Sequence, residues 1–429
     1  MLKKSMLLVS LIVLLSFVLG ACAPAAAPAE EAPAAEAPAE EAAAEAPAEE
    51  AAAGPSGDPI RIGMGAIMTG SDTYIHGELI TNAALLAAEE INAAGGVLGR
   101  PLEIVIQDDA GDPKQAVTVA HSFCDDESVV AVMVDPYSGM AFAAMPVYDE
   151  CGMPMINHGS NPRITEEGYP YAIQTNPNDL ITGFAAADYV NEVVGAKKVA
   201  VMHNKSMFGK GVADVFKLRC EELGMEITSY QGVDPEDVDF TPVLTKIKEE
   251  DPDVVYFAGY VETALIKNQM TQLGMDQVFV AAEATSTEYI EQTKDNGVGT
   301  ISATGAPPLD FRPEIAEFDA KFFEKYGNHP ESWAPYYYDR VYAYADIITK
   351  AGEATRDAIK MQLFNVDVPS IVYPKGLQVD EGGRAKNPVT FVYEMQPDYT
   401  FKLVYLWEGT PPYTTMSKED YTALIDSLR

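Results

Sequence analysis

The chain has 429 residues and carries 65 acidic against 29 basic side chains, which gives a formal charge of −36 at pH 7. A protein this acidic is repelled by phosphate backbones, so nucleic acids and other anionic ligands are disfavoured as partners. Residues 58–429 contain normal amounts of large apolar residues, and a segment of that length favours two lobes over one core.

The first 22 residues have the pattern of an export signal. Lys3 and Lys4 precede the apolar run MLLVSLIVLLSFVLGAC, which is shorter than a comfortable membrane span and ends in small residues. The ending LGAC resembles the bacterial lipobox, whose cysteine is lipidated and becomes the new N-terminus. We therefore expect Cys22 to anchor the chain to a membrane; an ordinary signal peptide with an incidental cysteine is the alternative.

Residues 23–57 consist almost entirely of alanine, proline, glutamate and glycine. They contain nothing large enough to build a core, and repelling glutamates with prolines favour an extended chain. We interpret them as a tether that holds a soluble domain off a membrane surface. Setting aside its eight glutamates and the two lysines of the signal leaves the remaining chain at about −30, so the acidity is not confined to the tether.

Strand and helix patterns alternate from residue 60 onward. The strand patterns are IRIGMGAIM, LEIVIQDD, VVAVMV and PMINHG in a first series, and KVAVMHN, EITSY, DVVYFAG and QVFVAA in a second. Amphipathic helix patterns separate them, for example 77–96, 113–124, 209–224 and 262–274. Apolar strands alternating with amphipathic helices indicate parallel sheets covered on both faces. We predict an α/β fold with two Rossmann-like lobes.

In such sheets the ligand lies at the carboxyl ends of the strands. The residues that directly follow the predicted strands are therefore the candidate ligand contacts. They are 71–76, 135–138, 158–161, 204–208, Tyr260 and Glu283.

Enzymatic motifs find no support in these positions. A nucleophile elbow needs G-x-S-x-G, but Pro136 and Met140 flank Ser138 where the glycines should stand. The run GMGAIMTG has Met68 where a dinucleotide-binding G-x-G-x-x-G requires glycine. A Walker A loop, zinc-ligand spacing and a calcium loop are also missing from the sequence, so we expect no cofactor, no metal and no enzyme.

A ligand-binding reading fits the same residues better. A serine hydroxyl at a helix start, beside free backbone N–H groups, binds a carboxylate well, and both Ser138 and the HGSN run at 158–161 offer this. Glu283 ends the strand pattern VFVAA and can pair with a cation. Together these groups describe a receptor for a zwitterion. The alternative is that Ser138 and Ser160 only cap helices and Glu283 is solvated.

The chain resembles the leucine/isoleucine/valine-binding proteins, the type I substrate-binding proteins of branched-chain amino acid ABC transporters. The matching stretches are INAAGGVLGRPLEIVIQDDAGDPKQAV, PVYDECGMPMINHGSNPRIT, KVAVMHNKSMFGKG and DVVYFAGYVETALIKNQMTQLG. The resemblance runs collinearly from about residue 60 to the C-terminus. It implies two lobes joined by a three-segment hinge with the ligand cleft between them: 58–176 with 307–390, and 177–306 with 391–429.

The resemblance also implies roles for individual residues. Ser138 and Ser160, with the Gly159 backbone, would hold the carboxylate of an amino acid, while Tyr260 and Glu283 would hold its ammonium. An apolar wall would then comprise Tyr74 or His76, Tyr137, Phe208 and an aromatic residue near Tyr336.

Some residues depart from the family pattern. The HGSNP loop is one residue shorter than usual, which puts Ser160 in doubt, and His158 is unusual in it. Gly111 and Tyr137 replace the cysteines of a disulfide that some members have. The aromatic stripe of the WAPYYYDRVYAYADII run, which includes Tyr337 and Tyr344, is typical of a helix core stripe, although aromatics at its start could reach the cleft.

Three cysteines follow Cys22. An oxidising compartment permits a disulfide between Cys124 and Cys151, which end neighbouring helix patterns; two free buried thiols are the alternative. Cys220 is expected to be a small core residue.

The sequence thus predicts a monomeric, extracytoplasmic, lipid-anchored binding protein that captures an amino acid by hinge closure and delivers it to an ABC permease. We expect an amino acid, since a buried Glu283 is of little use to a neutral ligand, and the resemblance implies a branched-chain one. A same-fold receptor for an amide, urea or aromatic acid, or a sensory ligand-binding protein, are the alternatives.

Overall fold

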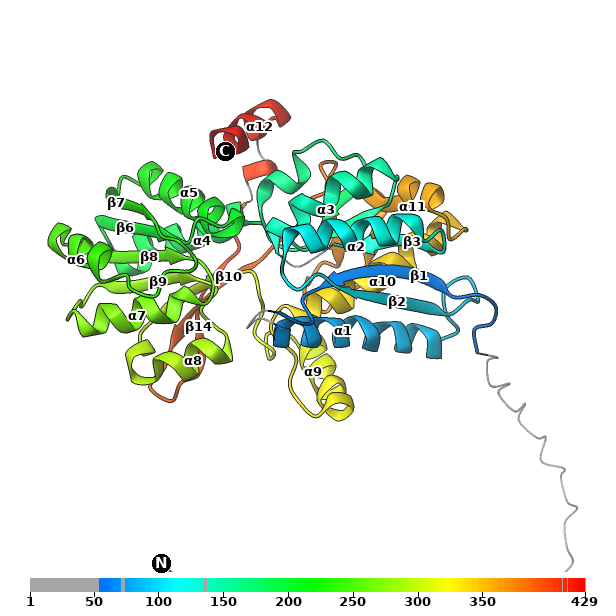
Figure 1. The fold of residues 1–429 in the computed structure, drawn as a ribbon, viewed down its shortest axis with the longest axis horizontal. Helices are drawn as coiled ribbons and strands as arrows, with labels where there is room; N and C mark the ends of the chain where they lie inside the picture. The colour runs from blue at the N-terminus through cyan, green and yellow to red at the C-terminus, as the bar shows by residue number, and fades with distance from the viewer. Residues whose placement is uncertain (1–53, 71–73, 135–136, 411, 415, 429) are drawn as a thin grey trace, which may run out of the picture. The chain divides into compact units, whose positions relative to one another are not determined.

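The computed structural model describes residues 54–70, 74–134, 137–410, 412–414 and 416–428, and Figure 1 shows its ribbon. The signal, Cys22 and nearly all of the tether lie outside these residues, as do the side chains of Tyr74 and His76. No described helix is both long and apolar enough to cross a membrane.

The first sheet contains five parallel strands in the order β2-β1-β3-β4-β5. Their bounds are β1 Ile60–Ala66, β2 Leu102–Asp108, β3 Val129–Met133, β4 Met155–Asn157 and β5 Ala172–Gln174. The central strand β3 is buried along its whole length, as expected for a parallel strand with helices on both faces.

Helices cover both faces of this sheet. Ala131 and Met133 of β3 pack in a core with one helix group, whereas Val132 packs with the other. The first group is α1 (Tyr74–Ala93) and the later helices α9 (Pro313–Tyr326), α10 (Ala334–Ala351) and α11 (Arg356–Gln362); the second is α2 (Pro113–Asp125) and α3 (Ser138–Glu150). Helices far apart in sequence thus complete one lobe, and α1 packs directly on α10 (Figure 1).

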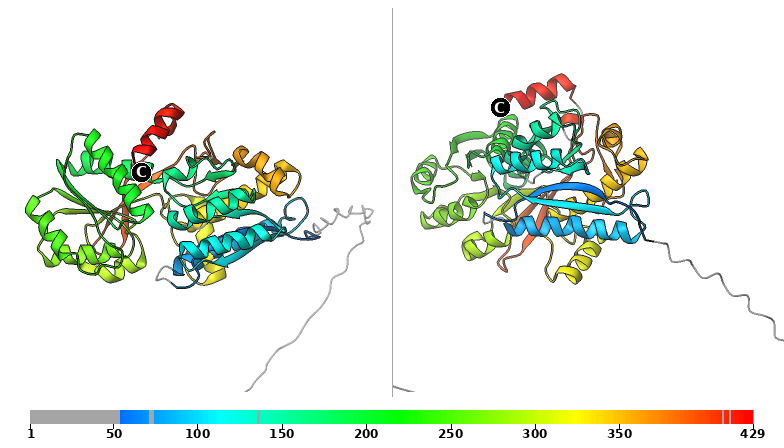
Figure 2. Two further views of the ribbon diagram at one scale, coloured as in Figure 1. Left: turned by 45° about the horizontal axis from the view of Figure 1, so that its top comes forward. Right: turned by 45° about the vertical axis from the view of Figure 1, so that its right-hand side comes forward.

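The second sheet contains seven strands in the order β14-β13-β10-β9-β8-β6-β7. Their bounds are β6 Lys198–His203, β7 Glu226–Gly232, β8 Val254–Ala258, β9 Val278–Ala282, β10 Ile301–Thr304, β13 Thr390–Met395 and β14 Phe401–Trp407. The helices of this part are α4 (Asp179–Tyr189), continued by a π-helical turn at Val190–Val194, α5 (Met207–Glu222), α6 (Thr241–Glu250), α7 (Glu262–Gln272) and α8 (Thr287–Thr293). Figure 2 shows them around the sheet.

The prediction of an α/β fold with two parallel-sheet lobes is confirmed. Within the two large sheets the antiparallel pairs are β10–β13 and β13–β14, and the sequence patterns did not anticipate β13 and β14. The chain passes between the two sheets after β5, after β10 and before β13. A two-stranded sheet, β11 (Asp367–Val368) and β12 (Leu377–Gln378), lies within the last of the segments that complete the first lobe.

The final helix, α12 (Lys418–Ser427), touches residues of both lobes. Its Ile425 is buried in a cluster with Phe184 of α4. On the other side, the Thr422 hydroxyl donates to Glu166 over 3.1 Å, and the Arg384 guanidinium lies 4.5 Å from the centre of the Tyr421 ring.

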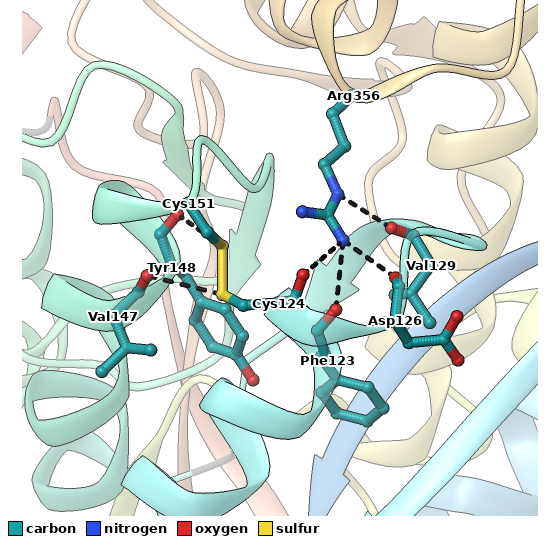
Figure 3. Close-up of a disulfide and its surroundings, with 8 residues drawn as sticks. All are labelled: Phe123, Cys124, Asp126, Val129, Val147, Tyr148, Cys151 and Arg356. Carbon is teal, nitrogen blue, oxygen red and sulfur yellow. Dashed lines mark hydrogen bonds between the residues drawn. A yellow bond between two sulfur atoms is a disulfide. The ribbon is translucent and has the colours of Figure 1, made fainter.

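A disulfide joins Cys124, near the end of α2, to Cys151, which caps the end of α3 (Figure 3). Beside it, Arg356 donates from Nη2 to the carbonyls of Phe123, Cys124 and Asp126 at 2.9 to 3.1 Å. The guanidinium thus satisfies carbonyl groups that the end of α2 leaves open. Cys220 is a free thiol buried in the core of the second lobe, as predicted.

Candidate ligand-binding site

A cavity of about 970 Å³ is lined by residues from both lobes. The lining includes residues that directly follow strands, which agrees with the expectation that parallel sheets bind ligands at their carboxyl ends. Of the predicted contacts, the structure brings together Tyr137, Ser138, Ser160, Phe208, Tyr260 and Glu283. Gly159 and Tyr336 are not among the lining residues.

Ser138 begins α3 and is 1% exposed. Its Oγ accepts a hydrogen bond from the backbone N–H of Asn161 over 3.2 Å, across from the loop after β4. The preceding residue, Tyr137, occupies the N-cap position and makes no side-chain cap bond. Ser138 is therefore held from the neighbouring loop instead of capping its own helix, and its hydroxyl proton remains available to a carboxylate.

Gly159 allows the loop after β4 to approach α3 closely. A β-carbon at this position would lie 3.1 Å from the Ser138 Cα and 2.8 Å from the Ile164 Cδ1. The Gly159 carbonyl accepts a hydrogen bond from the Gln174 side chain over 2.6 Å. The structure thus gives Gly159 a packing role, while its neighbour Ser160 reaches the cavity.

Glu283 follows β9 and faces the cavity from the second lobe. Its Oε1 accepts from the Thr304 hydroxyl over 2.9 Å, and its Oε2 accepts from the indole N–H of Trp333 over 3.2 Å. Burial raises the pKa of Glu283 to about 7, although both hydrogen bonds oppose the shift. Glu283 is half-buried as a residue and lines the cavity.

The backbone of Glu283 has φ of +64°, in the left-handed region. This conformation costs a residue with a side chain roughly 1 kcal/mol or more, and it persists where the surroundings fix it. The geometry turns the carboxyl group out of the strand direction and towards Thr304 and Trp333.

Three aromatic rings from both lobes form one wall of the cavity. The Tyr137 and Tyr260 rings meet edge to face with centroids 5.2 Å apart, and Phe208 stacks on Tyr260 at the same distance. The Tyr260 backbone N–H donates to Glu262, which is buried. Such rings supply apolar contact area for an aliphatic side chain.

His158 and Trp333 form a further part of the lining; His158 falls within the predicted contacts 158–161, whereas Trp333 was not among them. The His158 imidazole lies 4.9 Å from the Trp333 ring, edge to face, and stacks on Tyr337 at 5.0 Å. Burial, with a smaller contribution from Arg340, holds the pKa of His158 well below its usual value, so the ring is neutral. The sequence contains one indication that Trp333 and Tyr337 could reach the cleft, namely that both lie near the start of the α10 pattern.

The resemblance implies an aromatic residue near Tyr336; Tyr336 itself is not among the lining residues, whereas Trp333 and Tyr337 are. Tyr336 is 2% exposed, and its hydroxyl donates to the Gly305 carbonyl over 2.8 Å. The turn of the helix presents Trp333 and Tyr337 to the cavity instead. The core stripe continues as predicted, with Val341 and Tyr344 fully buried.

The charges around the cavity have one sign. Among the described residues that line it, the carboxyl groups are Glu283, Glu288, Asp310 and Glu331, and neither lysine nor arginine is present. Groups of three or more potential metal ligands are absent from the described residues. The arrangement therefore favours an organic cation with an apolar body over an anion.

The comparisons with known proteins decide the family. The family model for periplasmic binding proteins matches residues 59–397, most of the chain. The Leu/Ile/Val-binding protein homolog 1 of Brucella suis is 31% identical over 350 residues, which is 81% of this chain and 93% of that protein. This chain belongs to the Leu/Ile/Val-binding protein family.

Members of this family are binding components of transporters and not enzymes, in agreement with the missing catalytic motifs. A Pseudomonas aeruginosa relative described as a leucine-, isoleucine-, valine-, threonine- and alanine-binding protein is 31% identical over 349 residues, covering 80% of this chain and 91% of its own. Among solved structures, a leucine-binding protein of Thermotoga maritima is 25% identical, with a TM-score of 0.74, over 83% of this chain and 99% of that one. A Streptococcus pneumoniae branched-chain amino acid binding protein in complex with isoleucine has a TM-score of 0.73 at 25% identity, over 82% of this chain and all of that one.

Proposed function

We propose that this protein captures an amino acid outside the cytoplasm and delivers it to the membrane permease of an ABC importer. The observation that carries the proposal is the placement of Ser138 and Glu283 in the lining of one cavity, from different lobes. A hydroxyl donor suits the carboxylate of an amino acid, and a buried carboxylate suits its ammonium.

The ligand we propose is a branched-chain amino acid. The rings of Tyr137, Phe208 and Tyr260 offer apolar surface beside the polar groups. The names of the Brucella and Pseudomonas relatives, and isoleucine in the pneumococcal structure, support the same choice. A neutral amide, urea or an aromatic acid carries no ammonium group and would leave Glu283 without a cation.

Capture would proceed by hinge closure. The ligand first meets Ser138 and Ser160 in the lobe formed by 58–176 and 307–390. The other lobe, 177–306 with 391–429, then brings Tyr260 and Glu283 to the ammonium. Contacts made only in the closed state bias the equilibrium towards it, and the closed form is the one presented to the permease.

We also propose that Cys22 carries a lipid and that residues 23–57 tether the monomeric binding domain to the outer face of the membrane. A Cys22→Ser variant expressed in a bacterial host should leave the membrane fraction and lack the mass of the acyl groups. Persistence of the protein in washed membranes would contradict the anchor and leave the binding proposal untouched.

A thermal-shift screen tests the binding function directly. The full-length protein is heated with each of the twenty amino acids, urea, short amides and aromatic acids, since a ligand of the folded state raises the melting temperature. Leucine, isoleucine or valine should give the largest shifts. Stabilisation by urea or by an aromatic acid alone would overturn the ammonium site while keeping the transport role.

A further inference from the structure

Asp179 is a buried acid that the zwitterion site does not account for. Its side chain is 1% exposed, and neither carboxyl oxygen has a hydrogen-bond partner of good geometry among the described residues. The Ser160 hydroxyl lies near enough to lower the pKa of Asp179, but burial outweighs it and, with the nearby Glu283, raises that pKa to about 8. An unpartnered buried carboxyl group is costly, so it calls for an explanation.

Helix capping does not provide that explanation. Asp179 is the first residue of α4, where an acid commonly accepts free backbone N–H groups. Here its own N–H donates to the Ser160 carbonyl over 2.7 Å, and the N–H groups of Ile181 and Thr182 point to the Asn178 carbonyl. The Asp179 carboxyl group therefore stands at the helix start without capping it.

The groups around Asp179 come from four elements. Ser160, on the loop after β4, lines the cavity, whereas Asp179 is not among the lining residues. Helix α5 approaches with Gly211, where an added β-carbon would lie 3.6 Å from Asp179 Oδ2. The titratable groups that interact with it are Glu283 after β9 and the phenols of Tyr256 and Tyr260 from β8 and its loop. The Tyr256 hydroxyl is also buried without a partner among the described residues. These interacting groups are acidic and none is a cation.

We propose that Asp179 is a positioning residue for the cation of the ligand, acting through Ser160, and that it gives up a proton when that cation binds. The inference rests on the amino-acid binding function proposed above. Without ligand, two neighbouring buried carboxyl groups disfavour a double negative charge. When an ammonium enters between Ser160 and Glu283, the Asp179 carboxylic acid releases its proton to solvent and becomes a carboxylate. The carboxylate accepts the Ser160 O–H, which leaves a lone pair of Ser160 Oγ to accept from the ammonium. Ser160 thus serves the ammonium in this proposal, and not the carboxylate that the resemblance assigns to it.

The inference narrows the class of ligand. Since two acids and no base surround the subsite, the ligand must bring a cation of its own. An α-amino acid or its amide derivative with a free ammonium qualifies, whereas a carboxylic acid of the same carbon skeleton without nitrogen does not.

Isothermal titration calorimetry of the full-length protein with L-leucine tests the inference. Titrations near neutral pH in two buffers with different ionisation enthalpies give the number of protons released per ligand bound. We expect between one and two protons for the wild-type protein, because Asp179 with a pKa of about 8 is mostly protonated there and Glu283 with a pKa of about 7 is about half protonated. The Asp179→Asn variant should release fewer protons and bind leucine about tenfold or more weakly.

A control and a stability measurement separate this role from a structural one. Asp188→Asn, on the same helix, breaks an ion pair with Arg219 and should lower the melting temperature without changing leucine affinity. Asp179→Asn removes a buried unpartnered acid and should melt no lower than the wild type without ligand. Wild-type leucine affinity and proton release in Asp179→Asn would overturn the inference. If the wild-type protein binds no amino acid at all, the proposed function fails instead.

Discussion

The indole N–H of Trp333 donates to Glu283 Oε2 over 3.2 Å, and this bond connects the start of α10 in the first lobe to the end of β9 in the second. The same indole lies against His158, which shares a short loop with Ser160. One side chain thus links the two ends of the proposed amino-acid clamp.

Replacing Trp333 with phenylalanine should shift the pH dependence of ligand binding. The hydrogen bond from Trp333 lowers the pKa of Glu283, so its loss raises that pKa above about 7 and leaves more of the acid protonated at neutral pH. Affinity for leucine should fall as pH decreases in both proteins, and the fall should begin at higher pH in Trp333→Phe. Calorimetric titrations between pH 5.5 and 8.5, roughly one unit and a half on either side of this pKa, would measure it. Superimposable pH profiles would contradict the assignment.

Glu283→Gln should weaken amino-acid binding by about 2–5 kcal/mol, because a desolvated ammonium loses its charged partner. The fold should persist, since the amide oxygen can accept from the Trp333 indole N–H while the amide N–H₂ donates to the Thr304 hydroxyl oxygen. Glu291→Gln, at an exposed position of α8, is the matched control and should bind as the wild type does. Equal affinities of the Glu283 variant and this control in calorimetry would remove Glu283 from the site.

Ser138→Ala should weaken the binding of a ligand with a free carboxylate more than the binding of a ligand that lacks one. Leucine should lose about 1–3 kcal/mol of binding free energy, the range for a hydrogen bond to a charged group. Leucinamide keeps the ammonium but lacks the carboxylate, so its affinity should change less. A parallel titration of both ligands checks the orientation, and an equal loss for the two would show that Ser138 acts through packing alone.

Stability without ligand should fall with rising pH. The pKa of Asp179 is raised to about 8 in the folded protein, against about 3.9 in an unfolded chain. The folded state therefore binds the extra proton between these values, and the free energy of unfolding decreases by at most about 1.4 kcal/mol per pH unit from this group. Denaturant unfolding across this range should show a shallower slope in Asp179→Asn. Glu283 contributes in the same direction up to about pH 7 in both proteins.

Removing the disulfide should destabilise the first lobe without changing the ligand site. The bridge closes a loop between residues 27 apart in sequence, which corresponds to about 3.5 kcal/mol in the chain-entropy account. A Cys124→Ser, Cys151→Ser double variant should therefore melt at lower temperature, and Arg356→Met should add to the loss because four carbonyls lose their donor. Differential scanning calorimetry measures both. A melting temperature unchanged in the double variant would show that the bridge adds no stability.

The sequence predicted the parts of the site that depend on local order along the chain. Ser138 and Glu283 could be placed because each directly follows an apolar strand, and parallel strands bring their carboxyl ends together. Trp333 could not be placed in the cavity from the sequence, because the packing of α10 on α1 decides which of its first aromatic residues face the cavity. Asp179 gave no local signal, because an Asn-Asp pair before an apolar helix is typical of an ordinary cap.

The same distinction holds for the fold. The alternating patterns of 60–282 were sufficient to predict two parallel sheets. β13 and β14 return to the second sheet only after the chain has completed the first lobe, and they pair antiparallel at its edge. The strand with which β13 pairs depends on which sheet edge is free when the chain returns, and a local sequence pattern does not encode that.

The contacts of α12 open a practical route to observing capture optically. Ile425 packs with Phe184 of one lobe, while Tyr421 and Thr422 contact Arg384 and Glu166 of the other. If the lobes rotate about their connections on binding, this helix cannot keep both sets of contacts unchanged. The environment of a fluorophore attached near the C-terminus would then change whenever a ligand binds, and no label would be needed in the cavity. The last helix is thus a natural place to build a biosensor from this chain.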